Sequence, residues 1–101
     1  MTSTRKIGRI KELRAKEILE NAGYDVQMAP MPSRYSKQND LWGLWDLVAV
    51  NKNEIRFIQV KSQMIYGEQL EPYQEWICPS NCTKEIWVFE KYTRQPIQKI
   101  L

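Results

Sequence analysis

The sequence predicts an α/β fold, in which a mixed central β-sheet is flanked by helices and the elements follow the order α-β-β-β-α-β-β. Three observations support this prediction. Residues 4–21 carry apolar side chains at helical spacing, and residues 44–50 and 54–62 form two apolar runs joined by a short turn. A helical pattern at 68–78 is then followed by a strand-like run at 85–90.

The first helix is predicted to begin at Ser3 or Thr4, since either hydroxyl can cap it, and to stop before Gly23. Residues 24–28 then form a short first strand. The apolar face of the helix consists of Ile7, Ile10, Leu13, Ala15, Ile18, Leu19 and Ala22.

A loop over residues 29–40, broken by prolines and small polar residues, precedes a predicted hairpin. The turn Asn51-Lys52-Asn53 joins the two apolar runs of this hairpin. With a four-residue loop, Val50 faces Ile55 across the strands.

The remaining elements complete the sheet and its second helix. Residues 68–78 form the helix, with Pro72 in its first turn. Residues 85–90 form a strong strand and residues 96–101 a weaker one, with a turn at 93–95 between them.

Length and composition limit the class of protein. The 101 residues suffice for one domain, residues 1–101, but not for two. The N-terminus lacks the apolar segment of a signal peptide, and no run of eighteen apolar residues could span a membrane. A net charge of +3, with an isoelectric point near 8.9, is compatible with binding nucleic acid.

Histidine is absent, which excludes Ser-His and Cys-His triads and the zinc sites that need histidine. Cys78 and Cys82 are expected to be two reduced cysteines at a helix-to-strand turn, with a local disulfide or redox pair as the alternative. An enzyme built from this chain would use carboxylates, Lys, Tyr or a metal for acid-base chemistry.

The hairpin is expected to bring three polar side chains together. Its register places Asp46 opposite Gln59, with Lys61 diagonal on the same face. A carboxylate and a neutral oxygen can hold a divalent cation such as Mg²⁺. A neighbouring lysine can orient or help deprotonate the water that attacks a phosphodiester. An ordinary salt bridge between Asp46 and Lys61 explains the pattern equally well.

The first helix adds further candidates. Helical spacing puts Glu12 at the edge of the apolar face, and Arg5, Arg9 and Lys16 on the adjoining strip. Such a strip could contact successive phosphates beside the carboxylate. The alternative is a solvated face with an ion pair between Glu12 and Lys16.

Four segments in this order resemble the PD-(D/E)XK nuclease superfamily and, within it, the small archaeal and viral Holliday-junction resolvases. The resemblance covers residues 5–62. The segments are Gly8-Arg9-Ile10-Lys11-Glu12-Leu13, Ala22-Gly23-Tyr24-Asp25-Val26, Trp45-Asp46-Leu47-Val48-Ala49-Val50 and Phe57-Ile58-Gln59-Val60-Lys61-Ser62.

The resemblance implies a restriction-endonuclease-like core and a role for each matched residue. Asp46 would be the principal metal ligand, Gln59 would occupy the second acidic position and the carbonyl of Val60 would be a further ligand. Lys61 would be the catalytic lysine, and Glu12 would assist metal or water binding. The cofactor would be Mg²⁺, for which Mn²⁺ can substitute.

Two features depart from the family. Gln59 replaces the usual Glu, which removes a negative charge and should weaken metal binding. Trp45 stands where Pro often precedes the Asp. Ser33, in the loop after the first strand, could act as a loop serine seen in that group, and with Arg34 it is a DNA-binding candidate.

The expected function is a Mg²⁺-dependent endonuclease that cuts four-way or other branched DNA as a homodimer, since two symmetric nicks need two active sites. A repair or restriction-type nuclease on duplex or flapped DNA is one alternative. A non-catalytic DNA-binding module is another. We expect a cytoplasmic protein, and its compactness would suit a virus or a mobile element.

Overall fold

The structure is a computed structural model that describes residues 4–30, 40–91 and 93–101, with side chains from residue 7 onward. Helix α1 (Thr4–Asn21) ends as the sequence predicts. Gly23 has a φ of +96°, and the Tyr24 N–H donates to the Leu19 carbonyl at 3.1 Å. This is the Schellman arrangement, which favours a glycine because its left-handed backbone has no Cβ penalty.

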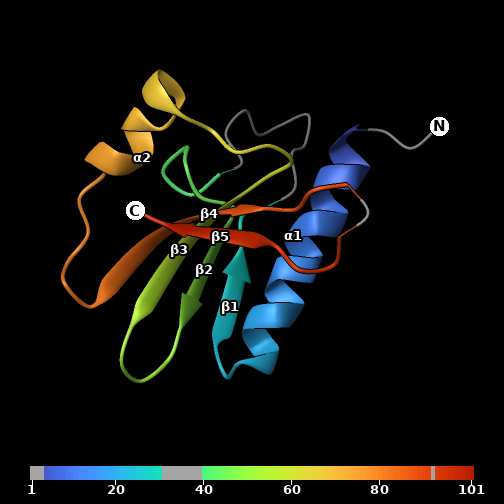
Figure 1. The fold of residues 1–101 in the computed structure, drawn as a ribbon. Coiled ribbons are helices and arrows are strands. Elements are labelled where there is room, and N and C mark those ends of the chain that lie inside the picture. Colours follow the sequence, from blue (N-terminus) through green and yellow to red (C-terminus); the bar gives the residue numbers. More distant parts are fainter. Residues whose placement is uncertain (1–3, 31–39, 92) are drawn as a thin grey trace.

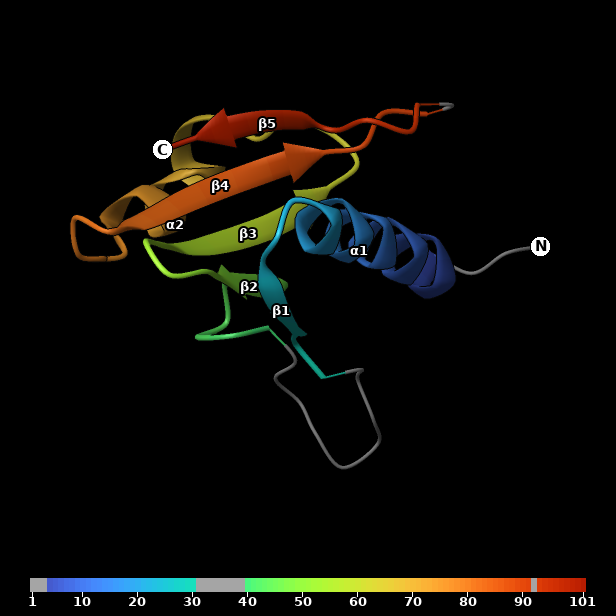
Figure 2. The ribbon, with the colours of Figure 1, turned by 90° about the horizontal axis from the view of Figure 1, so that it is seen from below.

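Five strands form one mixed sheet in the order β1-β2-β3-β4-β5. All neighbours are antiparallel except β3 and β4, which are parallel. The strands are β1 (Asp25–Met28), β2 (Leu47–Val50), β3 (Ile55–Lys61), β4 (Cys82–Val88) and β5 (Ile97–Ile100). The predicted α/β class with a mixed sheet is confirmed, and Figure 2 shows the strands stacked from β5 at the top down to β2.

The hairpin register is also confirmed, because Val50 pairs with Ile55. The Asn51 side chain fixes the turn: its Oδ1 accepts the N–H groups of Asn53 and Glu54 at 2.8 and 2.9 Å. Such a side-chain turn is the reason that asparagine is common at this position.

The largest differences from the predicted boundaries are in β2, β4 and the second helix. Strand β2 begins at Leu47 rather than at 44, and β4 begins at Cys82 rather than at 85. The second helix, expected over 68–78, is a 3₁₀ turn η1 (Gly67–Gln69) followed by the short α2 (Glu71–Glu75). The extended backbone of Trp76 ends α2, and parallel pairing with β3 extends β4 toward its start.

The sheet separates two apolar clusters, one on each face. On one face, α1 packs against the sheet (Figure 1), and the buried side chains are Ala15, Leu19, Val26, Leu47, Ala49, Ile58, Trp87 and Phe89. On the other, η1 and α2 cover a cluster of Trp45, Phe57, Ile65, Leu70, Tyr73, Ile86 and Val88. Helices therefore flank both faces, as predicted.

The predicted apolar face of α1 is only partly used. Ala15 and Leu19 are fully buried, but Ile10 is 62% exposed and Leu13 is 48% exposed. The N-terminal end of α1 extends past the strands (Figure 1), and Ile10 lies at an open pocket beside the connection between β4 and β5. Apolar side chains therefore remain on the surface.

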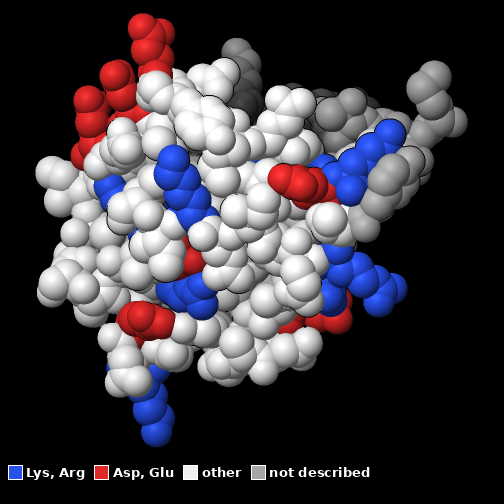
Figure 3. All heavy atoms as spheres, in the orientation of Figure 1, with Lys and Arg blue, Asp and Glu red and all other residues white. Residues whose placement is uncertain are grey.

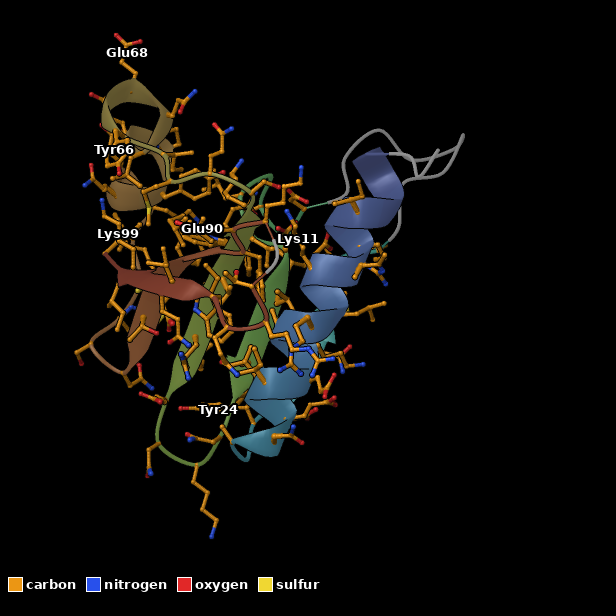
Figure 4. All side chains as sticks on the ribbon, turned by 45° about the vertical axis from the view of Figure 1, so that its right-hand side comes forward. Lys11, Tyr24, Tyr66, Glu68, Glu90 and Lys99 are labelled. Atoms are coloured by element: carbon orange, nitrogen blue, oxygen red, sulfur yellow. The ribbon has the colours of Figure 1, made fainter. Side chains whose placement is uncertain are left out.

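Individual side chains tie the elements together (Figure 4). Lys11 of α1 reaches the end of β3, where its Nζ donates to Ser62 Oγ at 2.7 Å. The Lys99 Nζ of β5 lies 5.4 Å from the centre of the Tyr66 ring. Both cysteines are free thiols, as expected. Within the described residues, no helix has the length and apolar character to cross a membrane.

Candidate functional site

Asp46 immediately precedes β2, where the regular pairing of β2 with β3 ends. Leu47 pairs with Ile58, yet the Asp46 N–H also donates to the Ile58 carbonyl at 2.9 Å. The Asp46 carboxylate turns toward β3 and accepts the Val60 N–H at 2.9 Å. Asp46 thus contacts the two residues that flank Gln59, close to the predicted position although outside the regular strand.

Gln59 is 6% exposed, and its Oε1 has no hydrogen-bond partner within the part of the chain that the structure describes. Residues two apart on a strand share a face, so Gln59 and Lys61 lie on the side of Phe57, which α2 covers. A buried amide oxygen without a partner is unfavourable by about 1–3 kcal/mol. This oxygen is free to accept a donor or to coordinate a cation.

Two residues that the sequence analysis did not single out complete the surroundings. Leu41 and Trp45 form an antiparallel bridge, which brings Asp40 beside Asp46, and Asp40 adds to the effect of burial, which raises the pKa of the Asp46 carboxyl. Tyr73 of α2 is buried, and burial together with the charges of Asp40 and Asp46 raises the pKa of its phenol. Asp40 stands at the end of the proline-containing loop, three residues before Gly43, a turn signal that could have drawn attention to it.

The negative charges of Asp40, Asp46 and Glu12 are not fully neutralised by nearby cationic side chains. Burial raises the pKa of Asp46 to about 8, against the opposing hydrogen bond from Val60, and the charges of Glu12 and Asp40 add to the effect. Burial also raises the pKa of Glu12, which the Arg9 charge opposes and Asp40 reinforces. Groups in this situation either hold protons or bind a cation.

The oxygens present suit a hard divalent cation. Mg²⁺ prefers carboxylate and carbonyl oxygens and keeps several waters. The candidate ligands are Asp46 and Gln59 Oε1, which the predicted strand register brings together, and the Val60 carbonyl, which the family resemblance implies. Among the described residues, no three Asp, Glu or Cys side chains form a metal-binding group by themselves, so neutral oxygens belong to any such site.

Lys61 is not engaged by the carboxylates. It is half-buried and pairs through its backbone with Val88. The alternative of an Asp46–Lys61 salt bridge is wrong, because the ion pairs between described residues do not include it. The Lys61 ammonium therefore remains available to a ligand.

The basic strip on α1 is partly committed to the protein itself. Arg9 lies 3.6 Å from Glu12 and donates to the Ala29 carbonyl at 3.3 Å. The alternative ion pair between Glu12 and Lys16 is wrong, since Arg9 takes the place of Lys16. Lys16 is half-buried.

Three of the predicted DNA-binding side chains lie outside the part of the chain that the structure describes. They are those of Arg5, Ser33 and Arg34. Figure 3 shows basic and acidic side chains side by side on the part of the surface where α1 lies, with further basic side chains elsewhere on this face.

Neither a scan against protein-family models nor a search of the curated proteins finds a match to this chain.

Proposed function

We propose that this protein is a divalent-metal-dependent endonuclease that hydrolyses phosphodiester bonds in branched DNA, with four-way junctions as the preferred substrate. The observation that carries the proposal is the buried Asp46 carboxylate beside the unpartnered Gln59 oxygen. The two hairpin segments of the PD-(D/E)XK resemblance, which contain Asp46 and Gln59, meet at this point, and this supports a restriction-endonuclease-like core.

Each residue has a role in the proposed reaction. Asp46, Gln59 Oε1 and the Val60 carbonyl hold Mg²⁺, or Mn²⁺ in its place. The cation supplies Lewis-acid stabilisation of the charge that develops on the phosphate. Lys61, which has no ion pair among the described residues, orients the attacking water and neutralises the scissile phosphate.

Glu12 assists at the metal or its water, and the basic residues of α1 position the DNA. Glu12 sits between Arg9 and the Asp46 site, where burial raises its pKa and allows it to accept or return a proton near the phosphate. Lys16 and the other basic side chains along α1 contact phosphates without reading bases. Two copies of the chain would bring two sites to one junction.

The decisive experiment compares cleavage of a synthetic four-way junction and its matched linear duplex, with Mg²⁺ and with EDTA. We expect the parent to cut the junction only with Mg²⁺. Asp46→Asn should lower the rate about a hundredfold or more, because several kcal/mol of charge stabilisation are lost. Folding should persist, since an amide oxygen can still accept the Val60 N–H.

Asp25→Asn is the matched control, because Asp25 is exposed on β1 and remote in sequence from the site. It should cut like the parent. Equal cleavage of duplex and junction would instead identify a repair or restriction-type nuclease. Binding without cleavage under any metal would identify a DNA-binding module.

A further inference from the structure

Asp40 is held by a tight turn rather than by a loose loop end. Leu41 and Trp45 exchange two backbone hydrogen bonds of 2.8 and 3.0 Å, and the Gly43 N–H donates to the Asp40 carbonyl at 3.0 Å. Trp42 and Gly43 have φ values of 52° and 70°. Left-handed backbone at both central residues is typical of the tightest hairpin turns.

The left-handed conformation of Trp42 is unfavourable for a bulky side chain and persists only where its surroundings impose it. Here the indole packs against Phe57 and Trp76, with ring centres 5.7 and 5.3 Å apart. Strain of this kind clusters at functional sites. Its effect is to fix Asp40 beside Asp46.

The two carboxyls lie in a setting that lacks a partner of opposite charge. Tyr73 belongs to the cluster that α2 covers, and burial together with the charges of Asp40 and Asp46 raises the pKa of its phenol. Arg9 is directed at Glu12 instead, and no ion pair among the described residues involves Asp40 or Asp46. Like charges this close are stable only with a shared proton or a bound cation.

Gln59 provides an independent indication of a ligand. It lies on the same α2-covered face, between the two residues of β3 that Asp46 contacts, and its buried Oε1 has no partner among the described residues. A proton shared by the carboxyls leaves this oxygen unpaired. A cation between the three oxygens satisfies all of them.

We propose that Asp40 supplies the second carboxylate of the divalent-cation site, so that Asp40, Asp46 and the Gln59 amide oxygen hold the cation together. Mg²⁺ sites in proteins commonly use one or two carboxylates with neutral oxygens and waters. Asp40 thereby replaces the charge that a glutamate at position 59 would provide. The inference rests on the metal site of the proposed function.

The test measures cation binding in the absence of DNA. Mn²⁺ is titrated into the parent, Asp40→Asn and Asp46→Asn, with free Mn²⁺ followed by electron paramagnetic resonance and Mg²⁺ competing at fixed ionic strength. Asp40→Asn should weaken Mn²⁺ affinity by at least about tenfold. In EDTA the same variant should melt at a higher temperature than the parent, because a negative charge beside the buried Asp46 carboxyl is gone.

Asp25→Asn again serves as the control and should match the parent in both measurements. Asp40→Ser gives a second variant if Asp40→Asn fails to fold. Parent-like Mn²⁺ affinity in both Asp40 variants, with loss in Asp46→Asn, would overturn the role of Asp40 and leave the endonuclease proposal standing. Loss of affinity in the Asp40 variants of a protein that cuts no DNA would support the cation site and overturn the endonuclease instead.

Discussion

At the scale of single residues, Gln59 is a neutral side chain at the centre of an acidic site. Asp40 adds to the effect of burial, which raises the pKa of Asp46, and a glutamate at the buried position 59 would add a third negative group nearby. The neutral amide therefore limits the free-energy cost of the metal-free fold. In the proposed metal site, the same neutrality would limit the affinity for the cation.

Gln59→Glu should separate these two effects. We expect Mg²⁺ to bind about tenfold more tightly, equivalent to about 1.4 kcal/mol, and cleavage to be preserved or raised at low Mg²⁺. In EDTA the variant should melt at a lower temperature than the parent. Calorimetric titration with Mg²⁺ and thermal unfolding with and without EDTA measure both.

Gln27→Glu on β1, where the side chain is exposed, controls for the added charge. It should leave Mg²⁺ affinity and melting temperature unchanged. Loss of activity in Gln59→Glu at every Mg²⁺ concentration would show that the amide donates a hydrogen bond that a carboxylate cannot.

At the scale of elements, the parallel pairing of β3 with β4 depends on a buried ion pair. Arg56 donates two hydrogen bonds to Glu85, of 2.7 and 2.8 Å, and the Glu85 side chain is 1% exposed. Thr83 and Trp87 donate to the same carboxylate at 2.6 and 2.9 Å. Every member of this network is satisfied, so it is a structural feature rather than a ligand site.

Glu85→Gln should lower the free energy of unfolding by about 3 kcal/mol, because the guanidinium of Arg56 would remain half-buried without its counter-charge. Urea unfolding at neutral pH measures this free energy for the parent and the variant. Glu75→Gln on α2, where the side chain is exposed, is the matched control and should change it by less than about 0.5 kcal/mol.

The same network predicts the direction of the acid dependence. Burial alone would raise the pKa of Glu85, but the hydrogen bonds from Arg56, Thr83 and Trp87 outweigh it and hold the pKa below 4.5. The stability that Glu85 contributes is thus complete above pH 4.5 and falls as the pH drops through the folded-state pKa. The difference between parent and Glu85→Gln should shrink over that range, and a constant difference would contradict this origin.

At the scale of the whole molecule, we propose the exposed apolar residues of α1 as the contact surface of a homodimer. Ile7, Ile10 and Leu13 are 42%, 62% and 48% exposed along one helix. A two-fold dimer formed through this surface would bury the same residues from both copies. It would also give the two active sites that two symmetric nicks require.

Ile10→Glu should dissociate such a dimer, because it places a charge in an apolar contact. Loss of about 2 kcal/mol per central side chain weakens association by about thirtyfold or more. Analytical ultracentrifugation measures the mass, and junction cleavage should change from paired nicks to single nicks. Ile77→Glu, at a side chain that is 91% exposed after α2, should remain a dimer. A parent that sediments as a monomer at all concentrations would contradict the dimer.

The sequence alone determined the local features of this protein. The stop of α1 at Gly23, the pairing of Val50 with Ile55 and the approach of Asp46 to the segment around Gln59 all follow from caps, turn length and alternation. These depend on residues close along the chain, which is why they could be predicted. The short α2 was not predicted, because apolar spacing alone does not show where tertiary packing ends a helix.

Only the tertiary structure decided which helix residues lie near Asp46 and which charge stays unpaired. The local turn at Leu41 and Trp45 brings Asp40 to Asp46, but Tyr73 comes from α2 and Glu12 from α1, and no spacing rule requires either to approach it. From the sequence, a salt bridge between Lys61 and Asp46 was as plausible as a catalytic role for Lys61. The packing of α1 and α2 on opposite faces of the sheet brings Glu12 and Tyr73 toward Asp46. Burial within this packing raises the pKa of Asp46, and no local sequence pattern specifies that burial.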